Sequence, residues 1–172
     1  MKKARLSTAL TAAVLLTGLS LNLYSQEAWH SPAGTTYIVT NTDSATGTFV
    51  SRSLISFYAD HHLAVVDSGQ GGTACSSTPS PSSPCPSGAF SSQLGGWRDS
   101  KGTLTGRTLD FDFPPPDNDL FRLDWTFTLG HDGRSISGTV TLSSFPLTAD
   151  PNEGSGTFIA KYDFTGYAVK VP

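Results

Sequence analysis

Residues 121–142, FRLDWTFTLGHDGRSISGTVTL, alternate between apolar and polar side chains on both sides of a short polar turn. From Phe121 to Leu129 every second residue is large and apolar, and the residues between them are Arg, Asp or Thr. From Ile136 to Leu142 the alternation resumes with Ile, Gly, Val and Leu. Because side chains on a β-strand point alternately to its two faces, this pattern predicts two strands that share one apolar face.

The turn between these strands is expected at Gly130-His131-Asp132-Gly133, since Gly and Asp favour turns. A two-residue loop around His131 and Asp132 would pair Phe127 with Ile136 and Trp125 with Gly138. The Trp125 ring would then cover the bare glycine backbone. The segment therefore predicts an antiparallel hairpin.

The rest of the chain after residue 25 follows the same period of two and contains no convincing helix. The fold class is predicted to be all-β: a single antiparallel up-and-down meander of about eight strands, closed into a barrel that removes exposed sheet edges. The predicted strands are 35–41, 47–58, 62–68, 90–98, 103–113, 119–129, 134–145 and 156–171.

The links between these segments alternate in length. Successive links of a meander lie at alternate ends of the barrel. The links at one end, 42–46, 69–89, 114–118 and 146–155, include the long ones, whereas 59–61, 99–102 and 130–133 are all short. We therefore expect one end closed by tight turns and the other framed by loops.

The first 25 residues have the pattern of a secretory signal peptide. Lys2, Lys3 and Arg5 precede an apolar run from Ala9 to Leu23, which is short and interrupted for a membrane span. Cleavage near Ser25 would leave one β-barrel domain, 26–172, secreted or periplasmic and without a membrane span. It would also change the net charge from −3 to −6, and a negative net charge disfavours nucleic-acid binding.

Cys75 and Cys85 are the two cysteines of the chain. Export favours a disulfide between them, because disulfides persist in oxidising compartments. The intervening residues are Ser, Thr and Pro, which predicts a Ser/Pro-rich disulfide loop at about 69–89.

Several short motifs along the chain resemble a family of small exported bacterial proteins of unassigned function. The motifs are Asp67-Ser68-Gly69, Gly95-Gly96-Trp97, 109–113 (LDFDF), Arg122, Gly133 and Ser137-Gly138-Thr139-Val140. That family is similar in outline to lipocalin-like, or calycin-like, eight-stranded barrels. The resemblance implies such a barrel here and names no acting residue.

No catalytic signature stands out in the sequence. There is no Gly-x-Ser-x-Gly elbow, and adjacent His61 and His62 would point to opposite faces of a strand, so we predict no catalytic residue, no cofactor and no metal site. Asp110 and Asp112 share one strand face at a spacing of about 6.5–7 Å, which fits the separation of paired glycosidase carboxylates, but this face lies opposite Phe111 and Phe113. We therefore expect both carboxylates in solvent.

The direction of the aromatic face decides the functional interpretation. If it points inward, the interior is either fully packed or holds one small ligand, and the sequence predicts an exported, non-catalytic protein that binds a small apolar molecule or acts as an accessory protein. One alternative is a barrel-cavity cyclase or isomerase, as in allene oxide cyclases and dirigent proteins, which needs an inward polar group. If it points outward, the chain is a small outer-membrane barrel. The oligomeric state is open. The candidate lining residues are Trp97, Phe111, Trp125, Phe127, Tyr162 and Phe164.

Overall fold

The computed structural model describes residues 30–70, 89–100, 103–113 and 119–170. The predicted signal peptide, Cys75 and Cys85 lie outside these ranges. The described residues form β-strands and the links between them, and no helix among them could cross a bilayer. The strands are β1 (Thr36–Asp43), β2 (Phe49–Phe57), β3 (His62–Asp67), β4 (Ala89–Phe90), β5 (Gln93–Ser100), β6 (Thr103–Phe113), β7 (Asp119–Leu129), β8 (Ser135–Pro146) and β9 (Thr157–Ala168).

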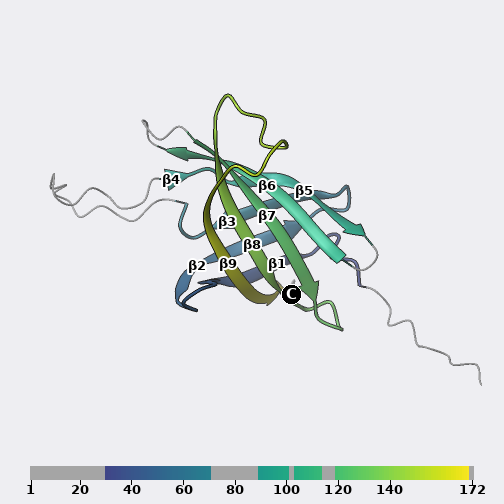
Figure 1. Ribbon diagram of the computed structural model, residues 1–172. Helices are drawn as coiled ribbons and strands as arrows, with labels where there is room; N and C mark the ends of the chain where they lie inside the picture. Colours follow the sequence, from purple (N-terminus) through teal and green to yellow (C-terminus); the bar gives the residue numbers. More distant parts are fainter. Residues whose placement is uncertain (1–29, 71–88, 101–102, 114–118, 171–172) are drawn as a thin grey trace, which may run out of the picture.

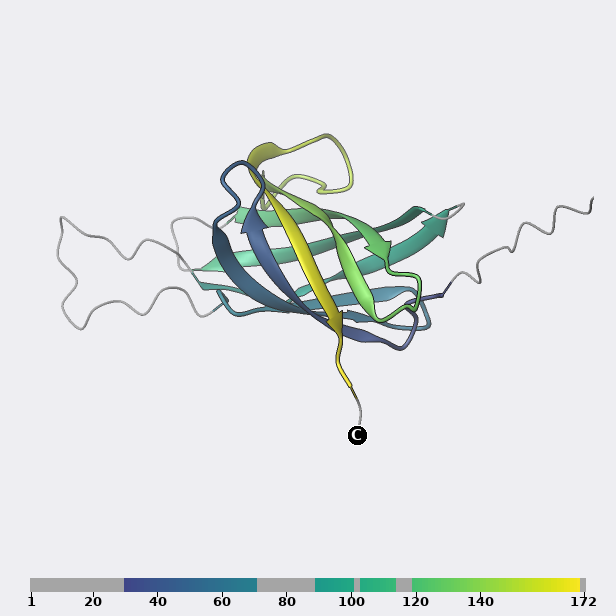
Figure 2. The same cartoon turned by 90° about the horizontal axis from the view of Figure 1, so that it is seen from below.

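Eight of these strands form the predicted closed antiparallel barrel (Figure 1). Each strand from β1 to β9, apart from β4, pairs with the next barrel strand, and β9 pairs back with β1. Figure 2 shows β9 in yellow between β1 and β8. The structure divides the predicted strand 90–98 into β4 and β5, and β4 pairs with the end of β6 through Phe90 opposite Asp112.

The β7–β8 hairpin differs from the predicted register by two residues. Trp125 pairs with Val140 and Phe127 with Gly138, because the chain reverses through four residues, 131–134, instead of two. The backbone N–H of Gly130 donates to the Ser135 carbonyl oxygen at 2.9 Å, and Gly133 takes a φ of +66°. A shift of two residues leaves every side chain on its predicted face, so the predicted apolar face is confirmed although the register was wrong.

The aromatic face points into the barrel. Trp125 is 3% exposed and belongs to one buried cluster with residues from all eight barrel strands. Arg122 and Asp124 lie on the outer side of β7. The inverted arrangement, with the charged side chains inside and the aromatic rings outside, is therefore wrong.

The β6 strand has the opposite orientation to the one predicted for its second half. Leu104 and Thr108 are fully buried inside the barrel, so Asp110 also points inward and Phe111 points out, 50% exposed. The first half of β6 explains this phase: Leu104 fills the core, and a Cβ on Gly106 would clash with Leu63. β6 pairs with β7 without a bulge, so its side chains alternate regularly between the two faces along the whole strand. Residues 109–111 therefore continue the alternation that the first half of the strand sets.

The two ends of the barrel differ. At one end, hereafter the turn end, lie the links 58–61 and 130–134. His61, at a φ of 67°, turns the chain there, and the Asp60 carboxylate contacts the His62 Nδ1 at 2.8 Å. At the other end, the loop end, the chain enters the links 44–48, 68–92 and 147–156, of which 71–88 lie outside the described residues.

Candidate functional site

Aromatic rings fill the turn end of the interior. Phe57 lies at their centre, with ring-centroid distances of 5.8 Å to Tyr37, 5.7 Å to Trp97 and 5.0 Å to Phe127, all in edge-to-face geometry. Such contacts stabilise a core beyond simple burial. Together with Trp125 and Phe164, these residues are called the aromatic plug.

The plug ends at Trp125, about halfway along the barrel. Its ring stacks on Phe127 at 5.8 Å and meets Phe164 edge-on at 5.6 Å. Its indole N–H donates to the Thr108 hydroxyl at 2.9 Å, in an environment where both groups are buried. Trp125 therefore joins the apolar and the polar parts of the interior.

Five of the six predicted lining residues lie inside the barrel. Trp97, Trp125, Phe127 and Phe164 are buried in the plug, and Tyr162 packs against it while half-buried. Phe111 is the exception, on the outer face, because of the phase of β6.

A polar cluster occupies the interior on the loop-end side of the plug. It consists of Asn41, Ser51, Ser53 and Asp67, from β1, β2 and β3. The Asn41 amide nitrogen contacts both serine hydroxyls, at 2.9 and 2.7 Å, and the Asp67 carboxylate at 3.1 Å. Both hydroxyls donate to Asp67 Oδ2, Ser51 at 2.8 Å and Ser53 at 2.6 Å. These contacts fix the Asp67 carboxylate inside the barrel.

Asp110 is a buried carboxyl group beside this cluster. It is 4% exposed, and its Oδ1 atom has no hydrogen-bond partner. Burial raises the pKa of Asp110 to about 7, and the carboxylates of Asp112 and Asp67 add to the rise. Asp110 is therefore able to gain or lose a proton near neutral pH.

Tyr162 faces the same region from β9. Burial raises the pKa of its hydroxyl, and the negative charges of Asp43 and Asp67 raise it further. The hydroxyl therefore remains protonated at neutral pH. The loop end of the interior thus combines carboxylates with a neutral phenol.

Water reaches some of the inward side chains at the loop end. Ser51, Asp67, Leu142 and Tyr162 keep partial exposure, whereas Tyr37, Phe57 and Leu104 near the turn end are fully buried. A small molecule entering the barrel would therefore meet the polar side chains before the aromatic plug.

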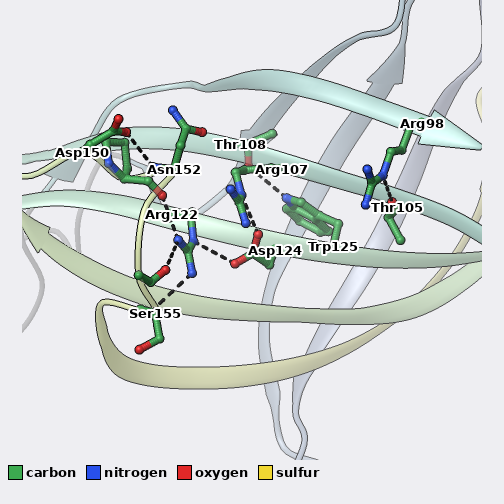
Figure 3. A network of polar contacts seen from close by, with 12 residues as sticks. Arg98, Thr105, Arg107, Thr108, Arg122, Asp124, Trp125, Asp150, Asn152 and Ser155 are labelled. Carbon is green, nitrogen blue, oxygen red and sulfur yellow. Dashed lines mark hydrogen bonds and ion pairs between the residues drawn. The ribbon is translucent and has the colours of Figure 1, made fainter.

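A second polar network lies on the outer face of β6 and β7 (Figure 3). Asp124 forms ion pairs with Arg107 at 2.7 Å and with Arg122 at 2.8 Å. The pair formed by Arg107 and Asp124 lines an open groove of about 560 Å³ that extends to Arg98 and Thr139.

Arg122 also holds the link between β8 and β9 against the barrel. Its guanidinium donates to the carbonyl oxygens of Pro151 at 2.7 Å, Gly154 at 3.0 Å and Ser155 at 3.4 Å. It lies over the Phe145 ring at 4.8 Å and is only 6% exposed. These contacts give Arg122 a structural role.

Sequence reasoning missed the inward polar residues, although a signal for some of them was present. Asn41 continues the alternation of Tyr37 and Val39, and Asp67 continues that of Leu63 and Val65. Extending each apolar alternation to the strand end would have placed both side chains inside. Within the described ranges, no group of three or more His, Cys, Asp or Glu side chains is placed to hold a metal ion.

Comparisons with known proteins identify no relative of this chain. No protein-family model matches the chain, and neither curated proteins nor solved structures give a match. The closed eight-stranded antiparallel barrel is consistent with the lipocalin-like architecture that the sequence motifs resemble.

Proposed function

We propose that this protein binds a small, largely apolar molecule with a polar end, inside the barrel and at its loop end. One observation carries the proposal: the interior is divided into a closed aromatic plug and a partly solvated polar region. Binding sites for small molecules combine apolar walls with a few fixed polar groups. The polar cluster and Asp110 would orient the ligand, and Trp125 would contact its apolar part.

The test is intrinsic fluorescence and thermal unfolding of the mature chain with a panel of linear and aromatic alcohols, acids and amines. We expect a subset to shift the Trp emission and raise the melting temperature. Trp125→Phe should lose most of the emission change, because Trp125 borders the polar region. Trp97→Phe is the matched control, since Trp97 lies in the plug near the turn end.

Two results would overturn the proposal. One is a panel in which no compound changes emission or melting temperature. The other is a signal that Trp97→Phe abolishes and Trp125→Phe preserves, which would locate the ligand elsewhere.

The buried Asp110 also favours a second candidate, a cyclase or isomerase that works inside the barrel. A carboxyl group with a pKa of about 7 is suited to general acid or base catalysis. A ligand that the protein converts would be recovered as a rearranged product by mass spectrometry, and Asp110→Asn would prevent the conversion. Recovery of the unchanged ligand would leave binding as the function.

The proposal includes export of the protein and membership of the resembled family. Edman sequencing of the protein recovered outside the cytoplasm should start near residue 26. The mass of the mature chain should increase on reduction if Cys75 and Cys85 form a disulfide. An intact Met1 in that fraction would contradict the cleaved signal peptide.

A further inference from the structure

Two hydrogen-bond acceptors are buried without a partner at the loop end of the interior. They are Oδ1 of Asp110 and Oδ1 of Asn41, whose residues are 4% and 6% exposed. A buried acceptor without a donor lowers the stability of the folded state. Both residues lie on inward positions of their strands, so a bound donor group would satisfy them.

The charge of this region selects the kind of donor. The carboxyl groups of Asp67, Asp110 and Asp112 interact electrostatically here. Every Lys and Arg on the described strands alternates with inward residues and so points outward; these residues are Arg52, Arg98, Arg107, Arg122 and Lys161. Among the described residues, the charged side chains that point into this region are carboxylates, and no Lys or Arg side chain points into it.

An organic ammonium group matches both features. It carries one positive charge and up to three N–H donors, whereas an alcohol has one donor and a carboxylate has none. Its hydrocarbon part would extend toward Trp125 and Phe164, where the plug begins.

We propose that the loop end of the barrel interior recognises the protonated amino group of an amphiphilic amine, with Asp110 and Asn41 as the acceptors. This inference rests on the proposed function, because it names the ligand class of the same site. A charge-assisted hydrogen bond is about twice as strong as a neutral one, and the pairing of opposite charges favours the ionised form of Asp110.

The affinity for an amine should rise with pH across the titration of Asp110. The charged groups that act on Asp110 are Asp112, on its own strand, and Asp67, on β3. The Tyr162 hydroxyl, on β9, interacts electrostatically with Asp67 and with Asp43 of β1. Gln93 and Thr108 beside Asp110 are neutral. Because Asp110 must be ionised to pair with the ammonium, binding should strengthen between about pH 5 and 8.

The test compares n-octylamine, n-octanol and octanoate, which share one chain and differ in the polar end. Titrations followed by Trp fluorescence should show octylamine binding at least about 10-fold more tightly than either of the others at pH 7.5. Asp110→Asn should abolish this preference and leave the affinity for octanol within about 2-fold. The matched control is Asp163→Asn, which removes an exposed carboxylate from the outer face of β9.

The outcomes separate the two proposals. Equal affinity for all three compounds, or an amine preference that Asp110→Asn retains, would overturn the amine assignment and leave ligand binding in place. If none of the compounds binds, and the wider panel does not bind either, the proposed function itself fails.

Discussion

Asp110 lowers the stability of the fold at the place where we propose that the ligand binds. A carboxyl group inside a barrel costs free energy unless it is neutral or paired, and Asp110 has neither a cation nor a full set of hydrogen bonds. A hydrophobic residue at this position would stabilise the fold. Residues that lower stability in a protein interior are often functional, which is the reason to assign Asp110 to the ligand.

We expect Asp110 to destabilise the protein as the pH rises. Its pKa is about 7 in the folded chain and about 4 when unfolded, so its contribution is most favourable below pH 4 and is lost as the pH rises toward 7. The loss is on the order of 3–4 kcal/mol. Asp110→Asn should therefore be more stable than the wild type at pH 7.5, by several degrees in melting temperature.

The measurement is the difference in melting temperature between wild type and Asp110→Asn from pH 4.5 to 8. Taking the difference removes the titration of groups common to both proteins. Parallel curves would mean that Asp110 is solvated, as the sequence alone suggested. Asp112→Asn should lower the pKa of Asp110 and so move the change to lower pH, because Asp112 adds to the rise.

At the scale of the element, the strands could be predicted from the sequence and the phase of β6 could not. Alternations such as that of β7 located all eight barrel strands within a few residues, because burial on one face requires a period of two. In β6 the first half favours Leu104 inside, whereas the second half favours Phe111 inside. Only the pairing with β5 and β7 decides between them.

Arg122 connects the link between β8 and β9 to the barrel. Arg122→Met should destabilise the protein by about 2–4 kcal/mol, because it removes three hydrogen bonds to carbonyl oxygens and one ion pair in a buried setting. Arg107→Met, on the same outer face, should cost less than about 1 kcal/mol, since its side chain is 41% exposed.

Urea unfolding gives both free energies, and hydrogen exchange reports the link directly. Amides in 150–155 should exchange faster in Arg122→Met and remain unchanged in Arg107→Met. Equal destabilisation by the two substitutions, with no change in exchange, would show that Arg122 does not hold the link.

At the scale of the whole molecule, a barrel closed by turns at one end and framed by loops at the other follows from strand count and link length. Its interior could be predicted only in part. The aromatic residues were found because they alternate with polar ones on long strands. The polar cluster was missed, because Asn41, Ser53 and Asp67 are polar residues on three adjacent strands, β1, β2 and β3, and the strand register brings their side chains together inside the barrel.

The central claim is that the ligand lies inside the barrel at its loop end. The most direct test is the ¹H–¹⁵N correlation spectrum of the labelled mature chain during titration with n-octylamine. Binding at this site should change the amide shifts of Asn41, Asp67 and Asp110 and leave those of Tyr37 and Phe57, at the turn end, unchanged. Changes confined to the outer groove, at residues such as Arg98 and Thr139, would contradict it.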